Sequence, residues 1–342
     1  MKFRPVPLGE AEGKVLGHNV TGLNGRRAFR KGRTLTAEDV GRLRDIGKRV
    51  IYVAELDRGD VDENNSANRV AEAAAGEGLD LSGPSTGRVN LRAKGLGVFR
   101  VDRPRLDRLN GCDGITLATL LTHSTVRPNQ IVATVKVIPF AVPSSVVIDA
   151  EGIAGEGGPL IWVDALERRK VGFILSASGG MRERIETQFA PLQERIEGLG
   201  SELVRIDHVD PNEGTAERVL AEAIRAQVKS GMDLIILAGE TAIMDRQDVA
   251  PRAIERVGGK LECLGAPVDP GNLLMLSYVG DVPVLGAPGC ARSRKVNVVD
   301  WVLPRLLVGE RLTRSDIASM GHGAYWTIRR NGRCHAPRSS CD

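Results

Sequence analysis

Aromatic residues and long apolar runs are both scarce in this sequence. Phe, Tyr and Trp make up 4% of the 342 residues, so the stacking surfaces that hold single-stranded nucleic acid are not expected. No segment reaches the roughly 18 apolar residues of a membrane span. The N-terminal sequence MKFRPVPLGEAEG lacks the apolar centre of a signal peptide. We therefore expect a cytoplasmic protein that binds neither nucleic acid nor membrane.

Cysteine and histidine form no standard metal-binding pattern. The five cysteines are scattered without a CxxC pair, which fits a reducing compartment. The C-terminal sequence RCHAPRSSCD matches no standard zinc spacing, and we expect residues 326–342 to be a disordered tail. The formal net charge is +4, which fits a small anionic ligand better than a DNA-binding surface.

Residues 1–150 are predicted to form a mixed α+β region. LTAEDVGRLRDIG has the pattern of a helix with Thr36 as N-cap and Gly47 at its C-terminal end. The next segment, RVIYVAEL, is typical of a strand.

The rest of this region is predicted to alternate between helix and strand. A second helix is expected over residues 65–75, and a short helix near 117–121 within otherwise β-rich sequence. The glycine-rich sequence IDAEGIAGEGGPL predicts a linker, which we place at residues 151–167.

Residues 168–325 are predicted to form a three-layer α/β/α domain with a mostly parallel sheet. Three apolar strands, KVGFILSA, SELVRIDHV and DLIILA, alternate with amphipathic helices. This order favours right-handed crossovers and helices on both faces of the sheet. Pro191 is expected to interrupt the first helix. Ligands bind such sheets beyond the carboxyl ends of the strands.

Four loops are expected to meet at that edge. They are residues 176–180 (SASGG), the turn 237–251 (LAGETAIMDRQDVAP), the segment PVDPGN that ends at Asn272, and residues 285–295 (LGAPGCARSRK). The fourth loop is expected to open the helix KVNVVDWVLPRLL. Its free backbone amides, that helix start and its basic residues suit a phosphate. A plain loop with solvated basic residues explains the same pattern equally well.

The turn 237–251 is unusually rich in polar side chains. Asp248 is expected to cap the helix that begins near Val249. Thr241 is either a ligand hydroxyl or an ordinary turn residue. Asp245 either holds a cation-bound oxyanion or pairs with Arg246, and a surface pair of that kind contributes only about 0–1 kcal/mol.

These loops resemble the molybdopterin-binding proteins of molybdenum-cofactor synthesis, namely the molybdopterin molybdenumtransferases and adenylyltransferases. Both families have a strand that ends in a glycine pair, then Ser or Thr, then Asp before a helix. Gly239, Glu240, Thr241 and Asp248 stand at these positions. The serine-bearing first loop and the Pro-Gly and Leu-Pro-Gly-Asn-Pro loops of the relatives are matched by SASGG, DPGN and GAPG. Two departures are Glu240 in place of the second glycine and SASGGM in place of Ser-Thr-Gly-Asp-Glu.

A narrower resemblance covers roughly residues 1–325. DRQDVAPRAIERVGG, PVDPGNLLML and GAPGCARSRKVNVVDWVL resemble a bacterial group in which a molybdopterin-binding region precedes a cytidylyltransferase-like domain. RKGRTLTAEDVGRLRDIG, GRVNLRAKGLGVFRVD and ATVKVIPFAV resemble the front part of the same group.

The resemblance implies a protein that binds molybdopterin or the molybdenum cofactor. If the protein is a transferase, Asp245 and Asp248 would be catalytic and would organise Mg²⁺ or molybdate. The relatives also imply a homo-oligomer with a molybdoenzyme or a cofactor-maturation protein as partner. The residues expected to bind the pterin are Ser176, Ser178, Gly239, Glu240, Thr241, Pro270, Gly271, Asn272, Gly286, Pro288, Gly289, Arg292, Ser293 and Lys295.

Two other functions compete with this interpretation. One is a non-catalytic carrier or sensor of the cofactor, which the departures at Glu240 and in the first loop favour. The other is a nucleotidyltransferase, because ILAGETAIMD superficially resembles the Leu-Ala-Gly-Gly-x-Ser-x-Arg-Met-Gly nucleotide loop. That similarity breaks at Glu240 and lacks the Arg-Met-Gly triplet, so it ranks below the other two.

Overall fold

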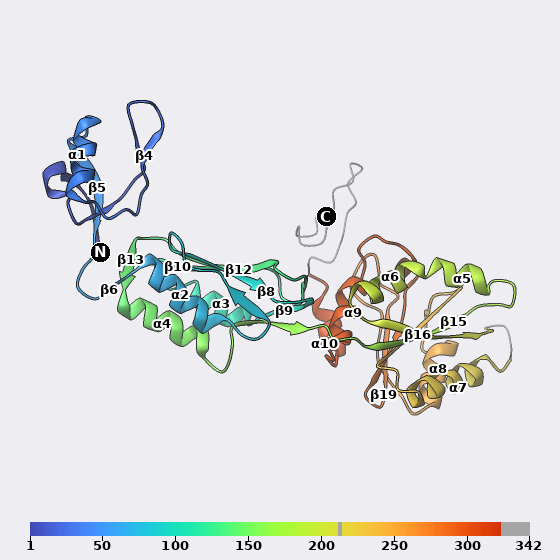
Figure 1. Ribbon diagram of the computed structural model, residues 1–342. Helices are drawn as coiled ribbons and strands as arrows, with labels where there is room; N and C mark the ends of the chain where they lie inside the picture. The colour runs from blue at the N-terminus through green and yellow to red at the C-terminus, as the bar shows by residue number, and fades with distance from the viewer. Residues whose placement is uncertain (211–213, 323–342) are drawn as a thin grey trace. The chain divides into compact units, whose positions relative to one another are not determined.

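The computed structural model describes residues 1–210 and 214–322 (Figure 1). The expected tail at 326–342 lies outside these residues. The chain forms two compact units. The first comprises residues 1–95, 99–122 and 126–163, and the second comprises 96–98, 123–125 and the chain from 164 onward. Within the described part, no helix has both the length and the apolarity that crossing a membrane requires.

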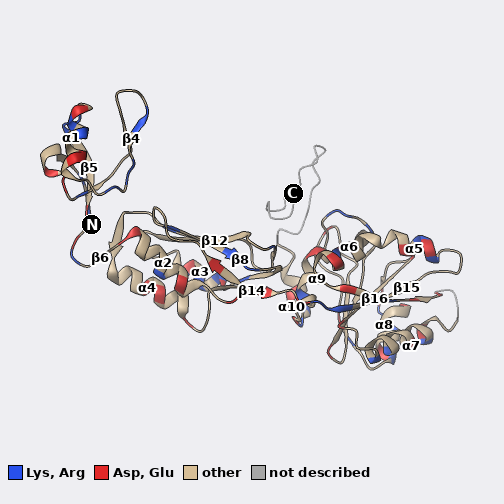
Figure 2. Ribbon diagram, in the orientation of Figure 1, with Lys and Arg blue, Asp and Glu red and all other residues tan. Residues whose placement is uncertain are grey.

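The first 55 residues have a hydrophobic core of their own. The helix predicted at LTAEDVGRLRDIG is confirmed, because the Thr36 side chain accepts a hydrogen bond from the Asp39 amide in a capping box. Lys and Arg residues are conspicuous at β4 in Figure 2. The elements are β1 (Lys2–Pro7), η1 (Leu8–Glu10), β2 (Val15–Leu16), β3 (Val20–Thr21), β4 (Arg27–Phe29), α1 (Ala37–Asp45) and β5 (Val50–Glu55).

The remainder of the first unit contains an antiparallel sheet of order β10-β12-β8-β7, with helices α2 and α4 packed together. The apolar side chains of the sheet and helices form one core. The elements from residue 60 to residue 165, of which β9, β11 and β14 extend into the second unit, are β6 (Asp60–Asp62), α2 (Glu63–Ala74), β7 (Leu79–Leu81), β8 (Arg88–Ala93), β9 (Gly97–Val101), α3 (Arg103–Leu109), β10 (Ile115–Thr119), β11 (Thr125–Val126), β12 (Ile131–Val137), β13 (Ala141–Pro143), α4 (Ser144–Gly155) and β14 (Ile161–Ala165).

Two predictions for this region are wrong. The short helix expected near 117–121 falls at the end of strand β10, in which buried Ile115 and Leu117 alternate with exposed Thr116 and Ala118. This alternation has the period of a strand. The linker expected at 151–167 contains the end of α4 and the whole of β14. Despite its glycines, α4 buries Val147, Ala150 and Ala154, and this packing outweighs the weak helix propensity.

The second unit is an α/β domain built on a six-stranded sheet of order β16-β15-β17-β20-β19-β18. Strands β16, β15, β17 and β20 are parallel, and β19 is antiparallel to both of its neighbours. The expected α/β class with a mostly parallel sheet is therefore confirmed. The elements are β15 (Lys170–Ser176), α5 (Arg182–Gln188), α6 (Ala190–Gly198), β16 (Glu202–Val209), α7 (Ala216–Lys229), β17 (Leu234–Gly239), α8 (Val249–Arg256), β18 (Lys260–Leu264), β19 (Met275–Val279), β20 (Val282–Gly286), η2 (Gly289–Arg292), α9 (Val299–Leu307) and α10 (Arg314–Ser319).

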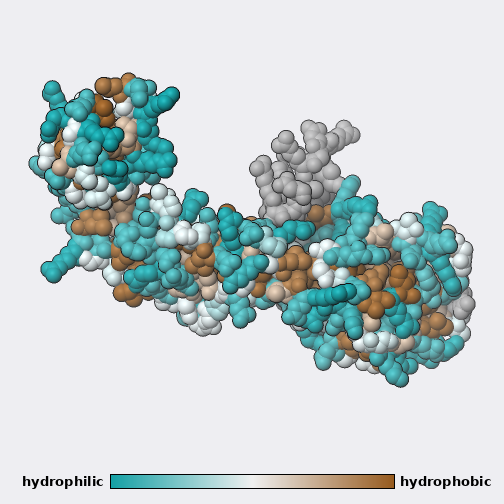
Figure 3. Space-filling view, in the orientation of Figure 1, coloured by the Kyte–Doolittle hydropathy of each residue, from teal (hydrophilic) through white to brown (hydrophobic). Residues whose placement is uncertain are grey.

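Helices cover both faces of this sheet (Figure 1). Helices α5, α6, α9 and α10 contribute to one core, and α7 and α8 contribute to the core on the other face. The predicted interruption near Pro191 is present, because α5 ends before Phe189 and α6 contains the proline in its first turn. The face seen in Figure 3 is largely hydrophilic, with apolar residues scattered over it, as is usual for a protein surface.

Candidate functional site

The four loops singled out from the sequence lie at one edge of the six-stranded sheet. Ser176 at the end of β15 pairs with Gly239 at the end of β17. Leu237 of β17 pairs with Gly286 at the end of β20, and Gly286 pairs with Met275 at the start of β19. The loops after β15, β17 and β20 and the loop that leads into β19 therefore share the carboxyl edge of the parallel strands, where ligands bind in open α/β sheets.

The first and second loops are joined through Ser178 and Glu240. The backbone amide and the hydroxyl of Ser178 each donate a hydrogen bond of 2.8 Å to Oε1 of Glu240. A Cβ on Gly239 would lie 2.7 Å from the carbonyl oxygen of Ser176, so glycine is required for the strands to approach here. The sequence identified these residues as candidates, but it gave no signal that Glu240 bonds to the first loop.

The carboxylates of the second loop organise the turn itself. Asp248 occupies the N-cap position of α8, as expected, yet its side chain forms no cap bond. Instead its Oδ2 accepts hydrogen bonds from the amides of Met244 at 2.6 Å and Asp245 at 2.9 Å. Oδ1 of Asp245 accepts one from the Gln247 amide at 2.8 Å. Thr241 and Asp245 are exposed at this edge.

The third loop is packed tightly against the chain that follows the fourth loop. The carbonyl of Pro270 accepts a hydrogen bond of 3.2 Å from the amide of Val298. Gly271 has a φ of 137°, and a Cβ there would lie 2.4 Å from Cγ1 of Val298. Pro270 and Gly271 therefore have a packing role that is visible without any ligand. Asn272 is exposed, and its carbonyl accepts a 3.0 Å hydrogen bond from the Ala266 amide.

The fourth loop differs from expectation at its C-terminal end. It passes through the 3₁₀ turn η2, and helix α9 begins only at Val299. Asn297 accounts for the delay, because its Oδ1 accepts a 3.1 Å bond from the Val299 amide and its Nδ2 donates one of 2.9 Å to the Lys295 carbonyl. The partial positive charge at a helix start falls off within one turn. The start of α9 therefore adds little to the positive potential around residues 292–295.

The two glycines and the proline of the fourth loop lie in different surroundings. A Cβ on Gly286 would lie 2.7 Å from Cδ1 of Ile243, in the second loop. It would also lie 2.8 Å from Cβ of Met275, so glycine is required for β20 to lie close to β19 here. Pro288 is buried, whereas Gly289 is exposed and a Cβ there would meet nothing within 4 Å. The exposed backbone of this loop is thus at Gly289.

Arg292 joins the fourth loop to the second. Its guanidinium donates to the carbonyl of Gly239 and, at 3.5 Å, to that of Glu240. The same group lies 5.0 Å above the ring of Phe189, a favourable cation–π distance. Its Nε is buried and has no hydrogen-bond partner among the described residues. The role of Phe189 as a support for this cation was not apparent from the sequence.

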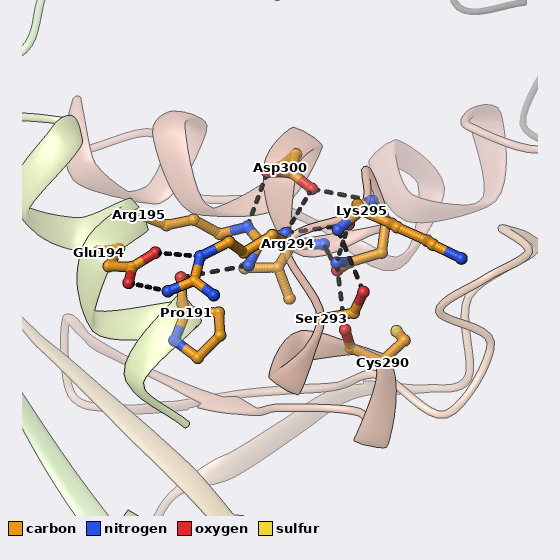
Figure 4. Close-up of polar contacts among 10 residues, drawn as sticks. Pro191, Glu194, Arg195, Cys290, Ser293, Arg294, Lys295 and Asp300 are labelled. Atoms are coloured by element: carbon orange, nitrogen blue, oxygen red, sulfur yellow. Dashed lines mark hydrogen bonds and ion pairs between the residues drawn. The ribbon is translucent and has the colours of Figure 1, made fainter. Parts of the chain in front are cut away.

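Of the other two basic residues of the fourth loop, Arg294 forms an ion pair and Lys295 does not (Figure 4). Arg294 forms an exposed ion pair with Glu194, with 2.8 Å between Nε and Oε2. The hydroxyl of Ser293 accepts a 3.1 Å hydrogen bond from the Lys295 amide. The Lys295 side chain points away from this cluster in Figure 4 and forms no ion pair within the described chain. Lys295 is therefore the cation of this loop that is available to an anion.

Burial sets the ionisation of the cysteine in this loop. It raises the pKa of the Cys290 thiol above its ordinary value. The thiol is therefore protonated at neutral pH and is neither a thiolate nucleophile nor a thiolate ligand there. Across residues 1–210 and 214–322, no group of three or more His, Cys, Asp or Glu side chains is placed to hold a metal ion.

The domain is thus a three-layer α/β structure with four loops at the carboxyl edge of its parallel strands. Residues 5–55 match a family model described as a domain of unknown function, DUF8806. No curated protein matches the chain.

Three solved structures of molybdenum-cofactor biosynthesis proteins are similar to the chain. One, from Pyrococcus furiosus, is 13% identical with a TM-score of 0.28, and the match covers 90% of this chain and 64% of that one. The molybdopterin biosynthesis MoeA protein from Pyrococcus horikosii is 11% identical, with a TM-score of 0.29 and coverages of 90% and 75%. The Mog protein from Mycobacterium ulcerans is 17% identical, with a TM-score of 0.28 and coverages of 40% and 91%. These values by themselves assign neither a ligand nor an activity.

Proposed function

We propose that the carboxyl edge of the six-stranded sheet binds molybdopterin or its molybdenum-loaded form, and that the protein acts in molybdenum-cofactor biosynthesis. The observation that carries the proposal is the meeting of four loops, distant in sequence, at this one edge. These are the same loops whose sequences resemble those of molybdopterin-binding proteins. Their common position supports one binding site rather than four unrelated turns.

The groups at the edge suit the anionic end of such a ligand. Lys295 and the hydroxyl of Ser293 would hold the phosphate, together with the exposed backbone at Gly289. Arg292 would contribute its positive charge without a direct bond to the phosphate, because its guanidinium donates to the carbonyls of Gly239 and Glu240. Thr241 and Asn272, both exposed, would contact the remainder of the pterin.

Binding without catalysis is the form of the function that the edge favours. The carboxylates expected to organise Mg²⁺ or molybdate, those of Asp245 and Asp248, already accept backbone hydrogen bonds within their turn. We therefore place the carrier or sensor function ahead of molybdate insertion. Hand-over to a molybdoenzyme or a maturation protein, and assembly into a homo-oligomer, are parts of the same proposal.

Replacement of the available lysine tests the phosphate position. Lys295→Gln should weaken molybdopterin binding about tenfold or more, because a charge-assisted hydrogen bond contributes roughly 1.5–3 kcal/mol. The measurement is a fluorescence or calorimetric titration with the pterin. Lys229→Gln is the matched control, since Lys229 is an exposed lysine at the end of α7, before β17 begins. The control should bind as tightly as the wild type.

Equal affinity of Lys295→Gln and the wild type would remove the phosphate assignment. Absence of pterin binding by the wild type would remove the function itself. A single-turnover reaction with molybdopterin and molybdate separates carrier from transferase, because a carrier forms the complex yet yields no molybdenum-loaded product.

A further inference from the structure

The Ser178 loop contains more hydrogen-bond donors than its own backbone uses. The amide and the hydroxyl of Ser178 point at one common acceptor, 2.8 Å from each. The next two amides, of Gly179 and Gly180, donate to no backbone carbonyl among the described residues. A Cβ added at either glycine would meet nothing within 4 Å, so open space adjoins the loop. Successive backbone N–H groups, here those of glycine residues, form concave sites in which proteins bind oxyanions.

The acceptor between these donors is the protein's own carboxylate. Oε1 of Glu240 receives both bonds from Ser178. The Glu240 amide in turn donates a 3.0 Å bond to the carbonyl of Ser176, so its backbone is fixed by the sheet while its side chain reaches the first loop. A carboxylate oxygen thus stands where one oxygen of a bound oxyanion would stand.

We propose that the Ser178 loop is an oxyanion site, for a phosphate-like group of a ligand, and that Glu240 occupies it as a built-in competitor. The inference rests on the proposed function only in taking this edge of the sheet as the ligand edge. A tetrahedral oxyanion has more acceptor oxygens than the single one that Glu240 supplies, and it could use the glycine amides as well. A ligand must displace the Glu240 side chain, so its apparent affinity is reduced by the fraction of molecules in which the site is closed.

Removal of the competing carboxylate tests this site with inorganic phosphate as the probe. Glu240→Ala should bind phosphate at least tenfold more tightly than the wild type in a calorimetric titration. Glu240→Gln should fall between them, because its amide oxygen still accepts from Ser178 but carries no negative charge. The double variant Glu240→Ala/Ser178→Ala should return to the wild-type value, since it has lost the hydroxyl that completes the site.

Glu255→Ala is the matched control for the change in net charge, because Glu255 is an exposed acid on α8. It should leave phosphate binding unchanged. Circular dichroism and the melting temperature verify that each variant is folded, and Glu240→Gln provides the test if the alanine variant is not. Equal phosphate binding by the wild type, Glu240→Gln and Glu240→Ala overturns the inference. A gain that survives in the double variant does so too.

The outcome is separable from that of the proposed function. If the wild type binds no molybdopterin but Glu240→Ala gains phosphate binding, the oxyanion site stands and the choice of ligand is wrong. If molybdopterin binds and Glu240→Ala gains nothing, the ligand stands and the competitor role of Glu240 is wrong.

Discussion

Each unit contains a cluster of polar groups. The groups of the first cluster bond to one another, whereas several groups of the second are exposed. In the first unit, Nζ of Lys136 donates to the carbonyls of Thr86 and Val137 and lies 3.6 Å from Oε2 of Glu63. Burial lowers the pKa of Lys136 and raises the pKa of Glu63. Two backbone carbonyls and the carboxylate of Glu63 thus face the ammonium. This cluster therefore fixes the turn at residues 86 and 87.

The edge of the second unit has the reverse character. Lys295 is exposed, and two donors of Ser178 are satisfied by one side-chain oxygen, Oε1 of Glu240. Shifted pKa values are often taken as a guide to functional sites. Here they do not separate the two clusters, because burial also raises the pKa of the Cys290 thiol in the fourth loop. The carboxyl edge that we propose as the ligand site is distinguished instead by topology, which brings open loops to the ends of parallel strands.

The largest expected effect concerns Gly271, the glycine that packs the third loop against Val298. Gly271→Ala should lower the free energy of unfolding by about 2–4 kcal/mol, because it combines steric overlap with Val298 and a backbone conformation unfavourable for L-residues. Gly87→Ala, in the cluster of the first unit, should cost less. Its φ of 69° is in the left-handed region, and two of its three closest neighbours are the side-chain ends of Glu63 and Lys136. Urea unfolding measures both, and the reverse order would contradict the assigned packing.

An intermediate effect concerns the dependence of stability on pH in the first unit. Burial raises the pKa of Glu63, although Lys136 and Lys31 oppose the shift. The folded state therefore binds the proton more tightly than the unfolded state. This contribution is present below the unfolded pKa of about 4.5 and is lost as the pH rises through the folded value.

Glu63→Gln carries no such titration. The free energy of unfolding of the wild type minus that of Glu63→Gln should thus be more favourable to the wild type at about pH 4 than at about pH 7. Urea unfolding of both proteins at the two pH values provides the measurement. A difference that is constant, or that grows toward neutral pH, would show that burial does not dominate at Glu63.

The smallest effect is expected at the exposed ion pair of the fourth loop. Arg294→Ala should change the free energy of unfolding very little, since the side chains of Arg294 and Glu194 are 73% and 50% exposed and water screens their attraction. Added salt should reduce even this difference. Thermal unfolding at low and high salt measures it. A large, salt-independent loss would indicate that this pair organises the edge.

Much of the second unit could be predicted from short-range patterns. Continuous apolar strands between amphipathic helices indicated the parallel sheet, and Pro191 marked the interruption between α5 and α6. The helix expected at residues 117–121 was wrong, because a five-residue segment has too few turns for its period to decide between helix and strand. The prediction of a linker was wrong because it relied on the glycines of the segment and overlooked the apolar face that α4 buries.

The order of strands and helices in the second unit, and the edge at which its loops emerge, were determined by the sequence, because apolar periodicity and right-handed crossovers act over neighbouring segments. Only the tertiary structure decided what the polar side chains of those loops do. Glu240 bonds to Ser178, 62 positions away, and Arg292 bonds to the carbonyl of Gly239, 53 positions away. Such pairings depend on the distance between loops after the sheet has formed, and no local pattern of residues encodes that distance.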